Sequence, residues 1–109
     1  MKIDLQQLEF IHPKLRKMMA LAETLFADEP TITSLYRIGD NGVHGQLPLR
    51  GIDIRCQNSD LGSAIEASVN EKWKYDPARP HMKCCMFHDV GLGEHLHFQV
   101  HPNTVEAEE

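Results

Sequence analysis

The chain has 109 residues, of which 41% are apolar and 25% are charged, a composition typical of a soluble globular protein that can bury one core. Its formal net charge is −5, and the basic residues are scattered along the chain, so we expect no nucleic-acid partner. No apolar run approaches the length of a membrane span, and Met1–Gln7 has no hydrophobic signal region. We therefore expect a cytoplasmic protein that does not contact membranes.

The three cysteines, Cys56, Cys84 and Cys85, are odd in number, and two of them are adjacent. Neighbouring residues of a strand point to opposite faces, which places Cys84 and Cys85 poorly for a disulfide bond with each other. The sequence also contains no Cys-x-x-Cys pair, which disfavours a structural zinc knuckle. We predict three buried, reduced thiols.

The first predicted helix runs from about His12 to Asp28. Pro13 suits its first turn, where a missing backbone N–H costs nothing, and Pro30 follows its end. Apolar residues recur there at spacings of three and four, which is typical of an amphipathic helix: Leu8, Ile11, Leu15, Met18, Ala22 and Leu25. A β-prone segment, Thr31–Ile38, comes next and ends at the turn residues Gly39–Gly42.

A second short strand is predicted at Arg50–Cys56, followed by a helix that Ser59 or Asp60 can cap and that ends near Tyr75. The buried stripe of this helix is predicted to be Leu61, Ile65, Val69 and Trp73. Further strands are predicted at Met82–Phe87 and Glu94–His101, and the acidic tail over residues 104–109 is expected to be frayed.

This order of elements predicts a single domain over residues 1–109. Its fold class is α+β, with a small, largely antiparallel sheet and helices packed on one side.

The most informative segment is the last strand. Successive side chains of a strand alternate between faces, so His95, His97, Gln99 and His101 share one face. The apolar residues between them share the other face and should point to the core: Leu96, Phe98 and Val100. Such a strand offers a rigid platform for a divalent metal, although a solvated face of surface histidines would give the same pattern.

Two further residues can complete a metal site. His44 lies in the loop after the first strand, and Asp53 faces away from its neighbours Ile52 and Ile54. A carboxylate in an apolar strand needs a compensating partner, which can be a metal ion or an arginine such as Arg37, Arg50 or Arg55. His44, Asp53 and His97 form a set of two histidines and one carboxylate. Three protein ligands with a fourth position left to water are typical of catalytic zinc.

The pattern resembles a known family. Val43-His44-Gly45, then Arg50-Gly51-Ile52-Asp53-Ile54, then Glu94-His95-Leu96-His97-Phe98-Gln99 are similar to motifs of the D-alanyl-D-alanine carboxypeptidase and lysostaphin-like zinc peptidases. These enzymes share their fold with the hedgehog signalling domain. The resemblance covers roughly residues 34–101 and is strongest to small phage- or prophage-encoded members.

The resemblance implies that Zn²⁺ is held by His44, Asp53 and His97. It implies that His95 or Glu94 acts as general base, and strand alternation favours His95 because Glu94 should face the other way unless Gly93 bends the backbone. It also implies that Arg37 binds the carbonyl or terminal carboxylate of the substrate. The expected reaction is hydrolysis of amide bonds in peptidoglycan stem peptides or their crosslinks, by attack of water.

The chain departs from that family in three places, one of which is the short spacing between Arg37 and His44. Gly42-Val43-His44 replaces the common Ser-x-His, and Gln46-Leu47-Pro48-Leu49 resembles an insertion between the first ligand and the aspartate. These departures keep a second hypothesis open, in which the chain is a catalytically degenerate, metal-binding phage structural or interaction domain. A third hypothesis is a plain α+β binding module whose histidines lie on the surface.

The remaining histidines of the C-terminal half, His81, His88 and His101, are predicted not to be ligands. His101 lies at the far end of its strand, and the other two flank the preceding strand. We expect His88 to be the one of the three that can hydrogen-bond a ligand or the substrate.

Overall fold

The computed structural model describes residues 10–26, 31–36, 40–89 and 93–107. It confirms the α+β fold class, with two helices and an antiparallel sheet in the strand order β1-β2-β5-β4. A second, two-stranded sheet pairs β3 with β6. The helices are α1 (Pro13–Leu25) and α2 (Ser59–Lys72), and a 3-10 helix, η2, spans Val43–Gly45; the strands are β1 (Ile32–Ser34), β2 (Gly51–Arg55), β3 (Trp73–Lys74), β4 (Cys85–Asp89), β5 (Glu94–Gln99) and β6 (Val105–Glu106).

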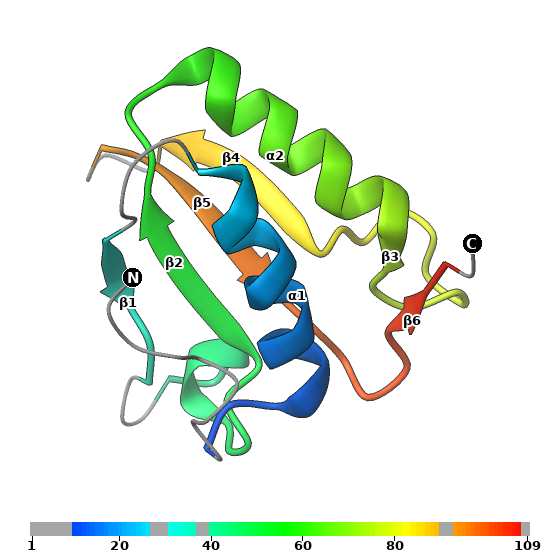
Figure 1. Ribbon diagram of the computed structural model, residues 1–109. Helices are drawn as coiled ribbons and strands as arrows, with labels where there is room; N and C mark the ends of the chain where they lie inside the picture. The colour runs from blue at the N-terminus through cyan, green and yellow to red at the C-terminus, as the bar shows by residue number, and fades with distance from the viewer. Residues whose placement is uncertain (1–9, 27–30, 37–39, 90–92, 108–109) are drawn as a thin grey trace.

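Helices α1 and α2 lie on the same face of the four-stranded sheet (Figure 1). The core forms between these two layers, because both helices and the near face of the sheet are apolar there. Fully buried members include Leu15, Met18, Ile65, Val69 and Phe98. This arrangement leaves the opposite face of the sheet available for polar side chains.

Helix α1 begins with Pro13 at its first turn, as predicted, and the side chain of His12 caps it by accepting a hydrogen bond from the backbone N–H of Lys14. The helix ends at Leu25, earlier than the predicted Asp28, because Phe26 already has an extended backbone. The predicted boundary itself lies among residues 27–30, outside the described residues.

The faces of β2 and β5 alternate as predicted. Asp53 pairs with His97 across the two strands, and Ile54 pairs with Leu96 on the opposite, helix-covered face. Leu96 and Ile54 are fully buried against the helices. The prediction that Asp53 faces away from its isoleucine neighbours is confirmed, and the register brings its carboxylate directly opposite an imidazole.

Helix α2 differs from its prediction at both ends. Asn58, rather than Ser59 or Asp60, is the N-cap, since its side chain accepts a hydrogen bond from the N–H of Leu61 at 3.0 Å. At the other end Trp73 leaves the helix and begins β3, so the predicted extension to Tyr75 is wrong.

Strand β4 begins at Cys85, later than the predicted Met82, and continues to Asp89. Asn70 of α2 holds the start of this strand through its side-chain amide. The amide oxygen accepts hydrogen bonds from the N–H groups of Cys84 and Cys85 at 3.1 and 2.9 Å, and the amide nitrogen donates one to the carbonyl of Cys85 at 2.8 Å. All three cysteines are buried and free, as predicted.

The prediction of a frayed tail is wrong for the described residues 104–107. Thr104 is only 2% exposed, and its hydroxyl donates a hydrogen bond to the carbonyl of Tyr75 at 2.7 Å. Val105–Glu106 then pairs with β3, and Glu106 forms ion pairs with Lys17 and Lys72. The acidic composition suggested a solvent-exposed tail, but pairing with β3 and ion pairs with two lysines keep this segment in place. Residues 108–109 lie outside the described part.

In the parts of the chain that the structure describes, no helix has the length and apolar character needed to cross a membrane.

Candidate metal centre

Three side chains from three separate elements meet over the two central strands, β2 and β5, beside the 3-10 helix η2 that precedes β2. His44 lies in η2, Asp53 in β2 and His97 in β5. One potential ligand atom from each lies within 4.8 Å of the others. His44 and Asp53 are buried, and His97 is largely covered. The structure thus brings together the three residues that the sequence predicted as ligands.

Two glycines allow η2 to pack closely against its neighbours, Gly51 toward the sheet and Gly45 toward the preceding loop. A Cβ atom added to Gly45 would lie 1.6 Å from the carbonyl oxygen of Asp40. One added to Gly51 would lie 2.5 Å from Cγ2 of Val43 and 3.4 Å from Nε2 of His44. The missing side chain of Gly51 leaves room for the His44 ring against β2, and that of Gly45 lets η2 close onto the backbone of Asp40.

The protonation of His44 follows from its contacts. Its Nδ1 lies 2.5 Å from the carbonyl oxygen of Leu35, and a carbonyl only accepts, so Nδ1 carries a proton. Its Nε2 faces Oδ1 of Asp53 at 3.4 Å, but it is buried and makes no hydrogen bond within the described residues. A bare lone pair facing a carboxylate is unfavourable, so a cation, either a proton or a metal ion, belongs between them.

His97 is held in a complementary way. Its Nδ1 lies 2.6 Å from Oδ1 of Asp53, and its Nε2 lies 3.0 Å from Oε1 of Gln99. The amide nitrogen of Gln99 donates to the carbonyl of Lys83 at 2.8 Å, which fixes the amide oxygen toward the imidazole. Nε2 of His97 therefore carries the proton that Gln99 accepts. Nδ1 is directed to Asp53, and because a carboxylate only accepts, a proton or a metal ion belongs between these two atoms as well.

The electrostatics favour an ionised Asp53. Burial alone would raise the pKa of its carboxyl, but the adjacent imidazoles of His44 and His97 outweigh burial and hold that pKa well below its usual range. The centre therefore offers an ionised carboxylate beside two imidazole rings, which is a borderline donor set suited to zinc.

The dimensions also suit zinc. Bonds of about 2.0–2.1 Å to histidine nitrogen and carboxylate oxygen place neighbouring ligands of a tetrahedral ion about 3.3 Å apart. Asp53 Oδ1 lies 3.4 Å from Nε2 of His44 and 2.6 Å from Nδ1 of His97, so these two pairs need adjustments of less than about 1 Å to hold an ion, and all three ligand atoms lie within 4.8 Å of one another. Each imidazole, moreover, has its other nitrogen held by an acceptor, as is usual for metal-bound histidine.

The three residues expected to act on the substrate are His95, Glu94 and Arg37. His95 lies on the metal face of β5, and its Nδ1 is 3.2 Å from the carbonyl oxygen of Gly93. Glu94 falls on the helix-facing side of β5, where the hydroxyl of Ser59 donates to its carboxylate at 3.4 Å. Gly93 does have a positive φ of 100°, but this does not bring Glu94 to the metal face. Arg37 lies outside the described residues.

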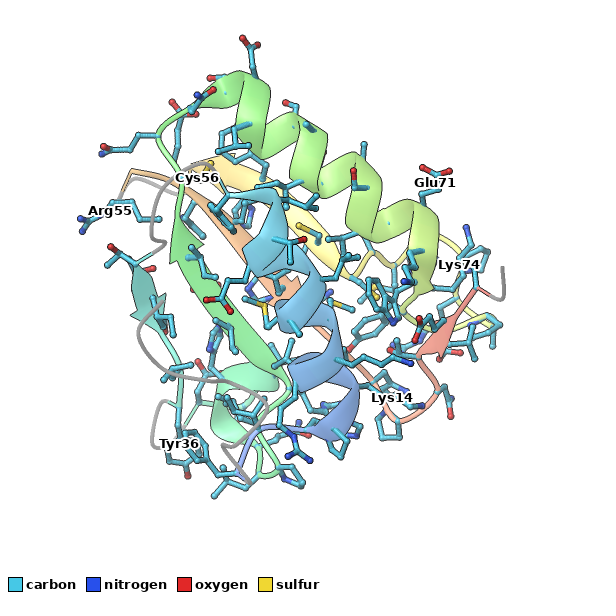
Figure 2. All side chains as sticks on the ribbon, viewed as in Figure 1. Lys14, Tyr36, Arg55, Cys56, Glu71 and Lys74 are labelled. Carbon is cyan, nitrogen blue, oxygen red and sulfur yellow. The ribbon has the colours of Figure 1, made fainter. Side chains whose placement is uncertain are left out.

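Two residues that the sequence named near the site, His88 and Arg55, lie beside His95, a position that the sequence did not predict. His88 of β4 pairs in register with His95, and the centres of the two rings lie 4.6 Å apart. Arg55 pairs with His95 from the other side, at the end of β2, and Figure 2 shows its side chain extending outward from that strand. Strand alternation alone could have placed each residue on a face, but only the register brings them to His95.

The histidines predicted not to bind the metal lie outside the three-residue centre. His81 is exposed. His101 packs against Tyr75, with ring centres 5.7 Å apart, and its Nδ1 accepts a hydrogen bond from the N–H of Asn103.

Comparison of the chain with protein-family models, curated proteins and solved structures found no match.

Proposed function

We propose that the chain is a zinc-dependent peptidase that hydrolyses amide bonds of peptidoglycan stem peptides or their crosslinks. In this proposal Nε2 of His44, the carboxylate of Asp53 and Nδ1 of His97 hold one zinc ion. The observation that carries it is the buried Nε2 of His44, which faces a carboxylate without a hydrogen bond among the described residues. When bound, zinc would polarise a peptide carbonyl and make water acidic enough to act as a nucleophile near neutral pH.

His95 is the proposed general base. The carbonyl of Gly93 accepts a hydrogen bond from its Nδ1, which leaves the lone pair of Nε2 free to take a proton from water. It lies two residues before His97 on the same face of β5, close to the metal but outside the ligand set. Glu94 is the weaker candidate, because its carboxylate is occupied by Ser59 on the other face.

The substrate class comes from the family resemblance, and the charge near the centre is compatible with it. Stem peptides end in a carboxylate, which requires a cation beside the catalytic groups. The resemblance assigns this role to Arg37. Among the described residues, Arg55 is a cation that pairs with His95 in register and is exposed to solvent.

The metal is tested by elemental analysis of protein purified without a histidine tag. We expect close to one zinc per chain, lost in both His44→Ala and His97→Ala. His81→Ala, a change at an exposed histidine, is the matched control and should keep the metal. Full zinc retention in both ligand variants would refute the assignment.

Catalysis is tested separately, by release of D-alanine or of cleaved stem peptides from purified peptidoglycan. His95→Ala should keep its zinc and its fold but lose about 10²–10⁴-fold in rate, the usual contribution of a general acid–base group. Equal rates for His95→Ala and the wild type would exclude His95 as the base, and the same loss in Glu94→Gln instead would transfer the role to Glu94.

A second candidate function is a catalytically degenerate, metal-binding interaction domain of the same fold. The observation that favours it is the exposure of two large apolar side chains, Leu47 at 62% and Phe10 at 42%, the first of which follows η2 by two residues. Their segments adjoin, because the N–H of Leu49 donates to the carbonyl of Phe10 at 2.6 Å. A zinc-loaded wild type that cleaves none of several peptidoglycan types would support this function over the peptidase.

A further inference from the structure

We propose that His88 and His95 form a second binding site for a divalent transition-metal ion, next to the three-residue centre and weaker than it. The ions that suit two imidazoles are zinc, nickel and copper. None of the residues that would bind this ion belongs to the set of His44, Asp53 and His97.

The geometry resembles that of the first centre. His88 and His95 occupy directly paired positions on the antiparallel strands β4 and β5, so both side chains leave the sheet on the same face. Their ring centres lie 4.6 Å apart with planes inclined at 60°, whereas those of His44 and His97 lie 5.4 Å apart at 57°. Two imidazoles bound to one tetrahedral zinc have ring centres about 5 Å apart, so both pairs fit one ion.

Both imidazoles are available for binding. The hydrogen bond from Nδ1 of His95 to the carbonyl of Gly93 directs its Nε2 lone pair away from the backbone. The His88 ring lies beside that of His95, with centres 4.6 Å apart, and is partly exposed on the same face of the sheet.

The site should be weaker than the first because it offers two ligands rather than three and no carboxylate. The remaining coordination positions would be left to water or to an anionic ligand from solution. The His88 ring centre is also 6.3 Å from that of His97, so an ion held here would lie close to the first one. Repulsion between two dications at this range further lowers the affinity for the second.

One consequence rests on the proposed function. An ion bound by His95 occupies the Nε2 lone pair that the peptidase reaction needs for proton transfer. Excess metal should therefore inhibit hydrolysis, although binding of the second ion does not depend on the chain being an enzyme.

The binding experiment is a calorimetric titration of metal-free, tag-free protein with ZnCl₂, repeated with NiCl₂. The wild type should bind two ions per chain in two separate steps. His88→Gln should keep the first step and lower the affinity of the second by about tenfold or more. His81→Gln makes the same change at an exposed histidine and should leave both steps as in the wild type.

Two results would overturn the proposal: a single step in the wild type, or a second step that His88→Gln and His81→Gln leave equally unchanged. Circular dichroism of each variant and the intact first step establish that the fold is kept. If His88→Gln also loses the first step, the two histidine pairs form one site and the proposal of a separate one is wrong.

The inhibition experiment distinguishes this inference from the peptidase proposal. If the wild type is active, we expect added zinc to inhibit it and to inhibit His88→Gln less, each measured against its own rate with one zinc per chain. Equal inhibition of the two would refute the role of the second site. If the wild type cleaves no peptidoglycan, the peptidase proposal fails, but the calorimetric titration still tests whether the second metal site exists.

Discussion

Replacing Gln99 with leucine removes the side chain that holds the proposed metal ligand His97 but leaves the ligand itself unchanged. Oε1 of Gln99 lies 3.0 Å from Nε2 of His97, and the side chain is almost fully buried. Leucine fills a similar volume but accepts no hydrogen bond, so the imidazole loses the group that fixes both its tautomer and its orientation. Loss of such an outer partner lowers metal affinity by about 10–100-fold, or about 1.4–2.7 kcal/mol.

The fold should tolerate this change. The other partner of Gln99 is the carbonyl of Lys83, an exposed residue whose carbonyl water can satisfy. The assay is competition for zinc with a chromophoric chelator near neutral pH, with thermal unfolding of the metal-free protein measured in parallel. Gln57→Leu, at an exposed position, is the matched control and should bind zinc as the wild type does. Equal affinities for Gln99→Leu and Gln57→Leu would show that the amide does not support the metal.

Three further predictions concern the framework around the centre. Gly51→Ala should weaken zinc binding and cost about 1–3 kcal/mol in unfolding free energy, because its Cβ would lie 2.5 Å from Val43; wild-type values in chelator competition and urea unfolding would contradict this. Asn70→Ala should lower the free energy of unfolding by about 3 kcal/mol, because it removes three hydrogen bonds to the start of β4. Asn58→Ala removes one helix cap and should lower it by about 1 kcal/mol; a larger loss for Asn58→Ala than for Asn70→Ala in urea unfolding would contradict this. Burial raises the pKa of the Cys84 thiol to about 12, so this thiol should not react with a disulfide reagent at pH 8 until the protein unfolds, and rapid labelling of the native chain, located by mass spectrometry, would refute this.

Much of the centre was predictable because the face to which a strand residue points depends on whether its position along the strand is odd or even. This is a local property of the sequence. Alternation placed His95 and His97 on one face of β5 and Asp53 on the matching face of β2, and the structure has both arrangements. Parity also separated His95 from Glu94, since neighbouring residues of a regular strand cannot share a face.

Segment boundaries were less predictable. Asn58, Ser59 and Asp60 are all good N-caps, and the backbone angles of the folded chain select Asn58. The segment Thr104–Glu106 has the composition of a solvated tail, but it is ordered through pairing with a strand more than thirty residues earlier in the chain. Short two-stranded pairings of this kind have no periodic signal in the sequence.

By itself, the sequence determined the fold class, the buried stripes of the helices and the faces of the two strands that carry Asp53 and His97. These features follow from contacts within a few residues, whose spacing is fixed by the backbone repeat. Tertiary structure alone decided that η2 brings His44 to within 3.4 Å of Asp53, that Gln99 holds His97, and that the register of β4 sets His88 beside His95. These contacts depend on loop paths and strand register, which are set by the packing of the whole core and leave no repeat in the sequence.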